Sequence, residues 1–395
     1  MRGIVSAADS ALLIVDDNED NRYTLTRRLQ REGYENLTTA NDGKQALDLL
    51  KSKPFDLVLL DVMMPGLTGY EVLERMRADN RLRHVPVIMI SALDEIDSVI
   101  RCIELGAEDY LSKPFNPTLL RARVGASLEK KRLRDEVIDA LNQVESELKA
   151  ARQIQLSMVP TEFLVPTPDR PVEVYAMLEP ARRVGGDLYD FFWGEDGRMY
   201  FVVADVSDKG APAALFMART KTMIRLIATL YRLPDGAPME PHRIIQKVNE
   251  GLSLENQEGM FVTVFLGILD PATSTLSFSN AGHNLPYLLR SGDGVSVLDG
   301  ARGKPLGIRP TFTYRSESRR FAPGDGLFVY TDGITEALNT ANELFSEVRL
   351  EETLRSLTAA SASEMVAGVL GRVRDFAANA VQADDIAAMG LRFMK

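Results

Sequence analysis

The sequence has 395 residues, of which 45% are hydrophobic, and this is enough material for two or three domains with cores of their own. Its net charge of −10, with acidic and basic residues interspersed, argues against binding to nucleic acid or to an anionic membrane surface. The single cysteine, Cys102, excludes an internal disulfide framework and a multi-cysteine zinc site. Because the chain shows no apolar stretch of membrane-spanning length and no signal peptide in residues 1–10, we expect a cytoplasmic protein.

Apolar runs and helical segments alternate over residues 11–125. The runs of strand length lie at residues 12–15, 57–60 and 87–90, with a weaker one near 36–39 and helices expected up to about residue 32 and near 70–77. Continuous apolar strands separated by helices predict a doubly wound parallel sheet that is covered on both faces. In this fold class the functional side chains lie at the carboxyl ends of the strands.

Polar side chains occupy the ends of these predicted strands. They are Asp16 and Asp17 after the first strand, Asp61 after the third, Ser91 after the fourth and Lys113 after the segment 109–111. The set resembles the receiver domain of two-component response regulators over residues 11–125. The resemblance implies phosphorylation by a sensor histidine kinase or a phosphotransfer protein. The alternative is a doubly wound domain with ordinary polar loop residues.

The chemistry of these five residues agrees with the resemblance. Asp16, Asp17 and Asp61 can hold Mg²⁺, which neutralises and orients an incoming phosphoryl group. Asp61 is the nucleophile that would become an acyl phosphate. Ser91 can donate a hydrogen bond to a phosphate oxygen, and Lys113 can pair with another. The Lys113–Pro114 bond is a candidate cis peptide, and Tyr110 matches the aromatic switch position of the family.

Residues 126–160 have a different composition and predict a helical linker. From 128 to 158 there is no Gly or Pro, and apolar residues recur at spacings of three and four. They are Leu133, Val137, Ala140, Val144, Leu148, Ala151, Ile154 and Met158. Such a stripe can pack on its own domain, but a position between two predicted domains favours a signalling helix or a short parallel coiled coil, and a homodimer is expected. Prolines at 160, 166, 168 and 171 then end the helix.

The C-terminal part contains four acidic positions beside apolar runs. In the stretch 200–217, an apolar run ends at Asp205 and is followed by a glycine-containing turn and a helical segment. Similar positions hold Asp187, Asp332 and the pair Asp384 and Asp385. A carboxylate at a strand end is a rigid ligand for hard cations such as Mg²⁺ and Mn²⁺. One such aspartate is commonly a turn residue, but four together predict a site for more than one metal ion.

Further strands and helices are expected around these positions. Strand-like runs lie at 199–204, 261–269, 275–279, 285–290 and 327–330, and helical segments at 211–230, 241–254 and 361–378. Strands grouped around long helices are typical of a layered α/β sandwich.

The motifs of residues 151–395 resemble those of the bacterial PP2C-type serine phosphatases of the SpoIIE and RsbU group. The motifs are Val184-Gly-Gly-Asp187-Leu-Tyr-Asp190-Phe, Ala204-Asp205-Val-Ser-Asp208-Lys-Gly-Ala-Pro-Ala-Ala-Leu, Asn280-Ala-Gly-His-Asn284, Tyr330-Thr-Asp332-Gly333 and Asp384-Asp385-Ile. The resemblance implies a phosphatase domain, placed at residues 161–395, with two antiparallel sheets flanked by helices. Two Mn²⁺ or Mg²⁺ ions are then expected at one end of the sandwich.

The family pattern also implies a role for each acidic residue. Asp205 would bridge the two ions, the carbonyl group of Val206 would add a ligand, and Asp332 and Asp385 would complete the main site. Asp187 would be a ligand of the second ion or bind it through water. Asp190 and Asp384 are weaker candidates.

One position departs from the eukaryotic PP2C pattern. Those enzymes usually carry a histidine two residues after the bridging aspartate, where this chain has Ser207. His283 lies elsewhere, and we favour a structural role in its loop over acid catalysis. Arg182 and Arg183 can be phosphate contacts or an ordinary exposed pair.

These observations predict a response regulator whose output is a metal-dependent protein serine/threonine phosphatase. The resemblance implies that the substrate is a phosphorylated STAS-type anti-sigma-factor antagonist of a partner-switching pathway. The first alternative is an adaptor with a phosphatase fold that binds a sigma-factor regulator without catalysis; the filled aspartate positions argue against it. The second, a receiver-controlled nucleotide cyclase or phosphodiesterase, lacks the GGDEF-like or EAL-like stretch that it would need.

Overall fold

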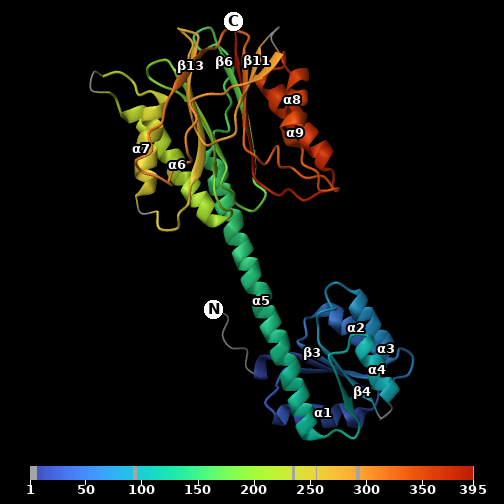
Figure 1. The fold of residues 1–395 in the computed structure, drawn as a ribbon. Coiled ribbons are helices and arrows are strands. Elements are labelled where there is room, and N and C mark those ends of the chain that lie inside the picture. The colour runs from blue at the N-terminus through green and yellow to red at the C-terminus, as the bar shows by residue number, and fades with distance from the viewer. Residues whose placement is uncertain (1–6, 92–95, 234–235, 255, 291–293, 395) are drawn as a thin grey trace. The chain divides into compact units, whose positions relative to one another are not determined.

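The computed structural model describes residues 7–91, 96–233, 236–254, 256–290 and 294–394. The chain divides into two units, residues 1–144 and 145–395, and the helix α5 (Pro117–Met158) contributes residues to both (Figure 1). Among the described residues, no helix combines the length and the apolar character needed to cross a bilayer.

The first unit is built on a five-stranded parallel sheet in the order β2-β1-β3-β4-β5. The strands are β1 (Leu12–Val15), β2 (Leu37–Ala40), β3 (Leu57–Asp61), β4 (Val87–Ser91) and β5 (Asp109–Ser112). The helices are η1 (Ala7–Asp9), α1 (Glu19–Arg31), α2 (Gly43–Ser52), α3 (Gly69–Ala78), α4 (Ile96–Glu104) and the first part of α5. The predicted doubly wound receiver fold is therefore confirmed.

Helices cover both faces of this sheet. Each strand contributes side chains to both cores, because neighbouring residues of a strand point in opposite directions. In β1, Leu13 and Val15 belong to the core formed with α2 and α3, whereas Leu12 and Ile14 belong to the core formed with α1 and α5. A strand that is buried on both faces has no polar positions to alternate with, which explains the unbroken apolar run in the sequence.

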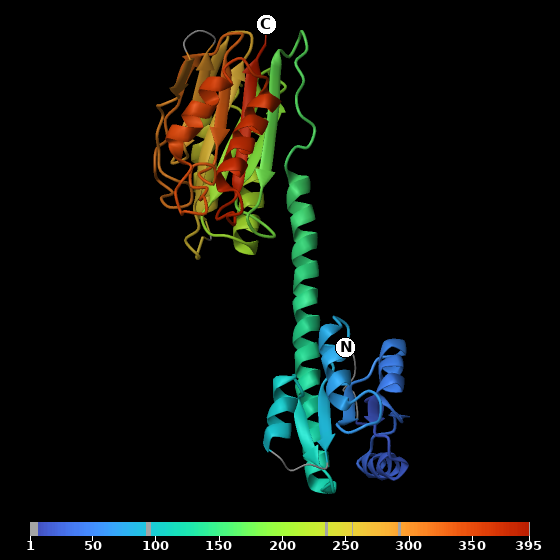
Figure 2. The same cartoon turned by 90° about the vertical axis from the view of Figure 1, so that its right-hand side faces the viewer.

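The second unit consists of two five-stranded antiparallel sheets, in the orders β13-β10-β9-β8-β7 and β12-β11-β14-β15-β6 (Figures 1 and 2). The strands of the first sheet are β7 (Leu188–Trp193), β8 (Met199–Val206), β9 (Val262–Asp270), β10 (Thr275–Ala281) and β13 (Glu317–Arg320). Those of the second sheet are β6 (Val172–Glu179), β11 (Tyr287–Arg290), β12 (Gly294–Val297), β14 (Gly326–Tyr330) and β15 (Ile386–Phe393).

The two sheets face each other across a common core, and helices cover their outer faces. Phe201 and Val203 of β8 share that core with Val329 of β14 and Met389 of β15. The helices α6 (Ala211–Leu230) and α7 (Pro241–Ser253) cover one outer face. The helices α8 (Ser346–Ser356) and α9 (Ala362–Ala377) cover the other. This four-layer arrangement confirms the predicted α/β sandwich.

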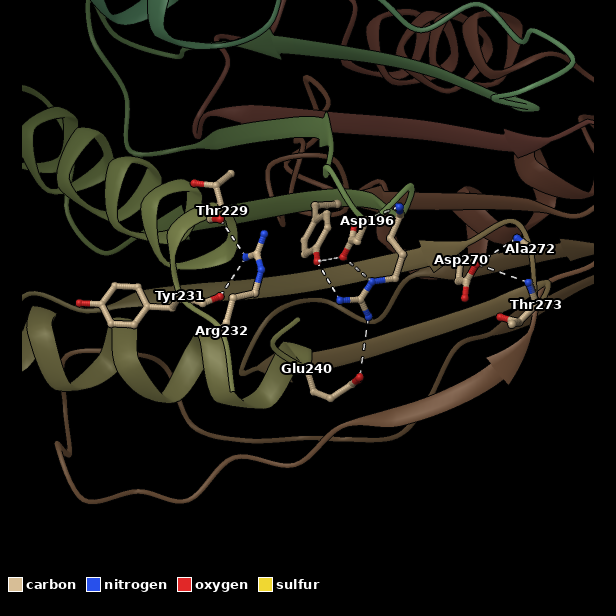
Figure 3. A network of polar contacts seen from close by, with 10 residues as sticks. Asp196, Thr229, Tyr231, Arg232, Glu240, Asp270, Ala272 and Thr273 are labelled. Carbon is tan, nitrogen blue, oxygen red and sulfur yellow. Dashed lines mark hydrogen bonds and ion pairs between the residues drawn. The ribbon is translucent and has the colours of Figure 1, made fainter. Parts of the chain in front are cut away.

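Polar contacts hold the connections at the end of the first sheet where β7 turns into β8 (Figure 3). Arg198 binds Asp196 in that turn and lies 3.8 Å from the carboxylate of Glu240, the residue before α7. Arg232, just after α6, donates to the carbonyl groups of Thr229 and Tyr231. Because β7 begins and β8 ends at the opposite end of the sheet, these contacts stabilise the sandwich away from the acidic residues.

Two candidate active sites

Three acidic side chains of the first unit converge at the carboxyl ends of neighbouring strands. Asp16 follows β1 and Asp61 ends β3, the strand beside it. One carboxylate oxygen from each of Asp16, Asp17 and Asp61 lies within 4.8 Å of the others. Asp16 and Asp61 are buried, whereas Asp17 is exposed. Clustered oxygen ligands with one side open to solvent fit a hard divalent cation such as Mg²⁺.

Lys113 lies beside the acidic cluster and links two of its members. Its Nζ atom is 2.8 Å from an Asp16 oxygen and 2.9 Å from an Asp61 oxygen. The backbone N–H of Lys113 donates to the carbonyl group of Ser91 at the end of β4, and the Lys113–Pro114 peptide is cis. All five residues predicted from the strand ends therefore lie at the same edge of the sheet.

The charge state of Asp61 follows from its surroundings. Burial raises its pKa to about 6, an effect that Lys113 opposes and the charges of Asp16 and Asp17 reinforce. Burial disfavours the charge on Lys113, but its hydrogen bonds to Asp16 and Asp61 outweigh this and raise its pKa. Above pH 6 the Asp61 carboxylate is therefore mainly ionised beside a cationic lysine.

Two polar residues that the sequence analysis did not single out hold the cluster in place. The side-chain amide of Asn21 donates to Asp16, 3.1 Å away. Arg22 donates to the carbonyl groups of Asp16 and Asp17. Both residues come from the first turns of α1, so the helix that follows β1 holds the Asp16 carboxylate and the backbone of Asp16 and Asp17.

The acidic residues of the second unit lie at strand ends of both sheets. Asp187 precedes β7, and Asp205 is the penultimate residue of β8, its antiparallel neighbour. Asp332 follows β14, and Asp385 precedes β15, again on neighbouring antiparallel strands. The four aspartates therefore gather where the two sheets bring these strand ends together.

Mutual repulsion and burial shift the ionisation of these residues. Burial and then the charge of Asp332 raise the pKa of Asp205 to about 7, although a hydrogen bond with Asp187 opposes the rise. Burial and then the charge of Asp205 raise the pKa of Asp187 well above its usual range. Such a group of buried carboxylates gains from a cation that neutralises it.

Asp332 and Asp187 each have a further neighbour that affects them. Burial raises the pKa of Asp332, and the charge of Glu336 adds to the effect. The hydroxyl group of Thr331 donates to Asp187 over 2.6 Å and accepts a hydrogen bond from the backbone of Ala387. Thr331 was not predicted, although its position directly before Asp332 is a signal.

Asp385 is held by the loop that precedes β7. Its two carboxylate oxygens accept backbone hydrogen bonds from Ala181 and Gly186, each 2.7 Å long. Each oxygen keeps a second lone pair that can bind a cation. The close approach needs glycines, because a Cβ atom on Gly185 would lie 2.2 Å from an Asp385 oxygen and one on Gly186 would lie 2.8 Å from the carbonyl oxygen of Val206.

The donor set of the second unit consists of oxygen atoms, which suit hard divalent cations. Among the described residues, Asp16, Asp17 and Asp61 are the one acidic group of three whose ligand atoms lie within 4.8 Å of one another. The carboxylates around Asp205 interact but are spread more widely. Two ions about 3.5–4 Å apart need ligands distributed over both. Asp187, Asp205, Asp332 and Asp385, with the nearby carbonyl group of Val206, are the candidates for such ligands.

Two other aspartates of the motifs are engaged by basic side chains. Asp190 is buried and pairs with Arg225 at 2.6 Å and with Lys221 at 3.1 Å. Asp384 pairs with Lys209 at 2.8 Å. An aspartate neutralised in this way has less to offer a metal ion, so Asp190 stabilises the packing of α6 on β7. Lys209, which follows Asp208 in the motif, was not assigned a role from the sequence.

Ser207 and His283 both form hydrogen bonds with residues of the neighbouring segment 261–263. The hydroxyl group of Ser207 accepts a hydrogen bond from the backbone of Phe261, 2.9 Å away. His283 is buried, and its Nδ1 atom lies 2.8 Å from the hydroxyl group of Thr263, the residue paired with Asp205 across β8 and β9. Burial lowers the pKa of His283 to about 3, so the ring is neutral. These contacts favour the structural role over acid catalysis.

Comparisons with known proteins agree with this division. The response regulator receiver domain model matches residues 12–125, and the model for Stage II sporulation protein E (SpoIIE) matches residues 195–394. The PP2C domain of SiaA from Pseudomonas aeruginosa superposes with a TM-score of 0.55 over 64% of this chain and 98% of that domain. At 20% sequence identity, this likeness is one of fold.

Two curated proteins are similar in sequence over part of their length. Protein IcfG of Synechocystis sp. is 32% identical over 247 residues, which are 55% of this chain and 37% of IcfG. The probable transcriptional regulator ycf27 of Guillardia theta is 44% identical over 119 residues, 30% of this chain and 45% of that protein. The chain therefore spans less than half the length of either relative.

Proposed function

Because this chain belongs to the SpoIIE family and joins a response regulator receiver domain to a PP2C-type phosphatase domain, we propose that it is a phosphorylation-controlled, metal-dependent protein serine/threonine phosphatase. The observation that carries the proposal is the convergence of Asp187, Asp205, Asp332 and Asp385 at one end of the sandwich, with raised pKa values for the first three.

In the receiver, Asp61 is proposed as the phosphoacceptor. Its carboxylate attacks the phosphorus of a phosphorylated imidazole on a sensor histidine kinase or phosphotransfer protein, and the P–N bond breaks. Lys113, 2.9 Å from Asp61, is placed to pair with the new phosphoryl oxygens, and Ser91 is proposed to donate to one of them. Asp16 and Asp17 would hold a Mg²⁺ ion that neutralises charge on the phosphoryl group.

In the phosphatase domain, the carboxylates are proposed to hold two ions. Asp205 would bridge them, Asp332, Asp385 and the carbonyl of Val206 would bind the main ion, and Asp187 would serve the second. Bound Mn²⁺ or Mg²⁺ would supply Lewis acidity and activate water for hydrolysis of a phosphoserine or phosphothreonine ester. Thr331 orients Asp187, and the 181–186 backbone orients Asp385.

The substrate proposed from the family resemblance is a phosphorylated STAS-type anti-sigma-factor antagonist. We further propose that helix α5 transmits the receiver state through self-pairing in a homodimer. Val137 and Val144 of the predicted stripe are 59% and 53% exposed, and with the exposed Ala140 between them their spacing of three and four matches a coiled-coil seam. A change in pairing or register of this helix would then alter the phosphatase domain.

Phosphate release from a phosphorylated STAS-type protein tests the proposal. The full chain is assayed with Mn²⁺ or Mg²⁺, before and after treatment with acetyl phosphate or beryllium fluoride, beside a reaction in excess chelator. We expect metal-dependent release whose rate changes with the phosphodonor. Binding of the STAS-type protein without release from it or from phosphoserine peptides would favour the adaptor instead.

A further inference from the structure

Near its C-terminal end, α5 is fastened to the loop before β7 by a buried side chain. Gln155 is 4% exposed, and its side-chain amide forms two hydrogen bonds with one residue. Its Nε2 atom donates to the carbonyl oxygen of Gly185 over 2.5 Å, and its Oε1 atom accepts from the N–H of Gly185 over 3.1 Å. Every polar group of the Gly185 backbone is thus bound to this helix.

Gly185 lies in a segment that carries one of the proposed ligands and contacts another. The next residue, Gly186, donates its N–H to Asp385, and the residue after that is Asp187. The Cα of Gly185 also packs against the Asp385 carboxylate, since an added Cβ would lie 2.2 Å from its Oδ2 atom. A shift of Gly185 would therefore displace Asp385 directly and Asp187 through two peptide bonds.

We propose that Gln155 is a positioning residue that holds the 185–187 segment in the conformation that binds the metal pair, so that its two hydrogen bonds with Gly185 set the metal affinity. This inference rests on the proposed phosphatase function. Groups that orient metal ligands without touching the ion have large effects on metal affinity, because a ligand in the wrong place must be moved before it can bind the ion.

The helix end has other anchors, so Gln155 is not needed to keep it in place. Val159 is buried in the core between the sheets, and the carbonyl group of Pro160 accepts a hydrogen bond from Tyr189. Arg152 donates to the carbonyl group of Arg182. Loss of the Gln155 amide should therefore change the loop more than the position of the helix.

The test compares Gln155→Ala and the same-sized Gln155→Glu with two controls in the full chain. Gln155→Glu can accept from the N–H of Gly185 but at neutral pH has no proton to give to its carbonyl oxygen. Val159→Ala weakens the packing of the same helix end, and Gln153→Ala changes an exposed glutamine of the same helix. A second set carries Asp17→Ala and Asp61→Ala, so that calorimetric Mn²⁺ titration reports the phosphatase site alone.

We expect both Gln155 variants to bind Mn²⁺ about 10–100-fold more weakly and to need correspondingly more Mn²⁺ for half-maximal activity, with kcat recovering at saturating Mn²⁺. Hydrogen exchange should accelerate in residues 181–187. Val159→Ala should lower the unfolding midpoint and Gln153→Ala should change nothing, and both should keep the wild-type Mn²⁺ affinity.

Wild-type Mn²⁺ affinity and exchange in a folded Gln155 variant would overturn the inference, as would a loss of affinity of the same size in Val159→Ala. If Gln155→Ala fails to fold, Gln155→Glu decides. A wild-type chain that binds Mn²⁺ but releases no phosphate would end the proposed function, while a Gln155-dependent affinity would still support the positioning role. A wild-type chain that binds no Mn²⁺ would end both.

Discussion

The two candidate sites differ in how their negative charge is balanced. In the receiver, Lys113 contacts both Asp16 and Asp61, so a cation belongs to the site itself. In the phosphatase domain, no lysine or arginine of the described residues lies within ion-pair distance of Asp187, Asp205, Asp332 or Asp385. In the receiver, Lys113 therefore partly neutralises the acidic cluster without a metal ion. In the phosphatase domain, repulsion among the carboxylates destabilises the folded state until cations bind.

The largest effect that would sharpen this comparison is on catalysis. Asp205→Asn or Asp332→Asn should lower Mn²⁺-dependent phosphate release by on the order of a thousandfold, because each removes a charge from the proposed ligands and the ions contribute several kcal/mol. Asp384→Asn is the control, since Asp384 is paired with Lys209 and should matter less. Full activity in the first two variants, or turnover of the wild type in chelator, would refute the metal mechanism.

Metal ions should also stabilise the two units unequally. At one hundred times its dissociation constant, Mn²⁺ should add about 2.7 kcal/mol to the free energy of unfolding of the phosphatase domain. Trp193 is the only tryptophan of the chain and lies in β7, so its fluorescence reports this unit. Chelator should lower the midpoint followed by Trp193; no change would mean that the carboxylates bind no ion in solution.

The next effect concerns the receiver alone. Asp61→Ala should abolish the response of phosphatase activity to acetyl phosphate or beryllium fluoride, a response expected to lie between about 5- and 150-fold. Basal Mn²⁺-dependent activity should remain, since Asp61 lies outside the phosphatase unit. Equal responses in the variant and the wild type would remove Asp61 as the phosphoacceptor.

A smaller, several-fold effect is expected from the helix that joins the sites. Val137→Glu and Val144→Glu place charges in the proposed seam, where burial costs on the order of a few kcal/mol, comparable to a coupling energy of roughly 1–3 kcal/mol. Light scattering should show weakened self-association, and phosphate release should respond less to the phosphodonor. An unchanged oligomeric state and response would reduce α5 to a tether and leave the phosphatase proposal intact.

The last effect is a stability change of opposite sign to the loss of activity. Without metal, Asp205→Asn should be more stable than the wild type near pH 8 by on the order of a few kcal/mol, because it removes a repelled charge. Since the pKa of Asp205 is raised to about 7 in the folded protein, the wild type binds a proton as the pH falls through 7, and the difference should shrink towards pH 5.

Asp61→Asn is the control for this comparison, because it loses the Lys113 ion pair together with the charge. Chemical unfolding in chelator at the two pH values measures both variants, with circular dichroism for the receiver and Trp193 fluorescence for the phosphatase domain. A metal-free Asp205→Asn variant that is less stable than the wild type at pH 8 would show that other groups neutralise the negative charge of the acidic cluster.

The receiver site was predictable residue by residue. Its polar positions follow short, purely apolar runs, and parallel strands bring their carboxyl ends to one edge. The positions of these residues along the chain are therefore enough to predict that they lie together at that edge. Asn21 and Arg22 were not predicted, because a polar residue at the exposed start of a helix forms no pattern that distinguishes it from other surface residues.

The phosphatase site was predictable by motif, but the strands on which it depends were not all visible. Neither β7 nor β15 was predicted from the sequence, although Asp187 and Asp385 border them. In β7, Asp190 interrupts the apolar run, and its charge is balanced by Arg225 from α6. In β15, Gly390 and two alanines make the segment hard to recognise as a strand, because these residues are not typical of strands. Gly390 lies against the backbone of Ala362 at the start of α9.

The sequence by itself determined which polar residues follow the strands of the parallel sheet, that a long helix connects the two domains, and which carboxylates are available for metal ions. Only the tertiary structure decided which of them stay uncompensated. Asp190 and Asp384 meet basic side chains, whereas Asp187, Asp205, Asp332 and Asp385 meet one another. The reason is physical: ion pairs form between atoms within about 4 Å of each other, and residues as distant in sequence as Lys113 and Asp16, or Gln155 and Gly185, come that close only when the chain is folded.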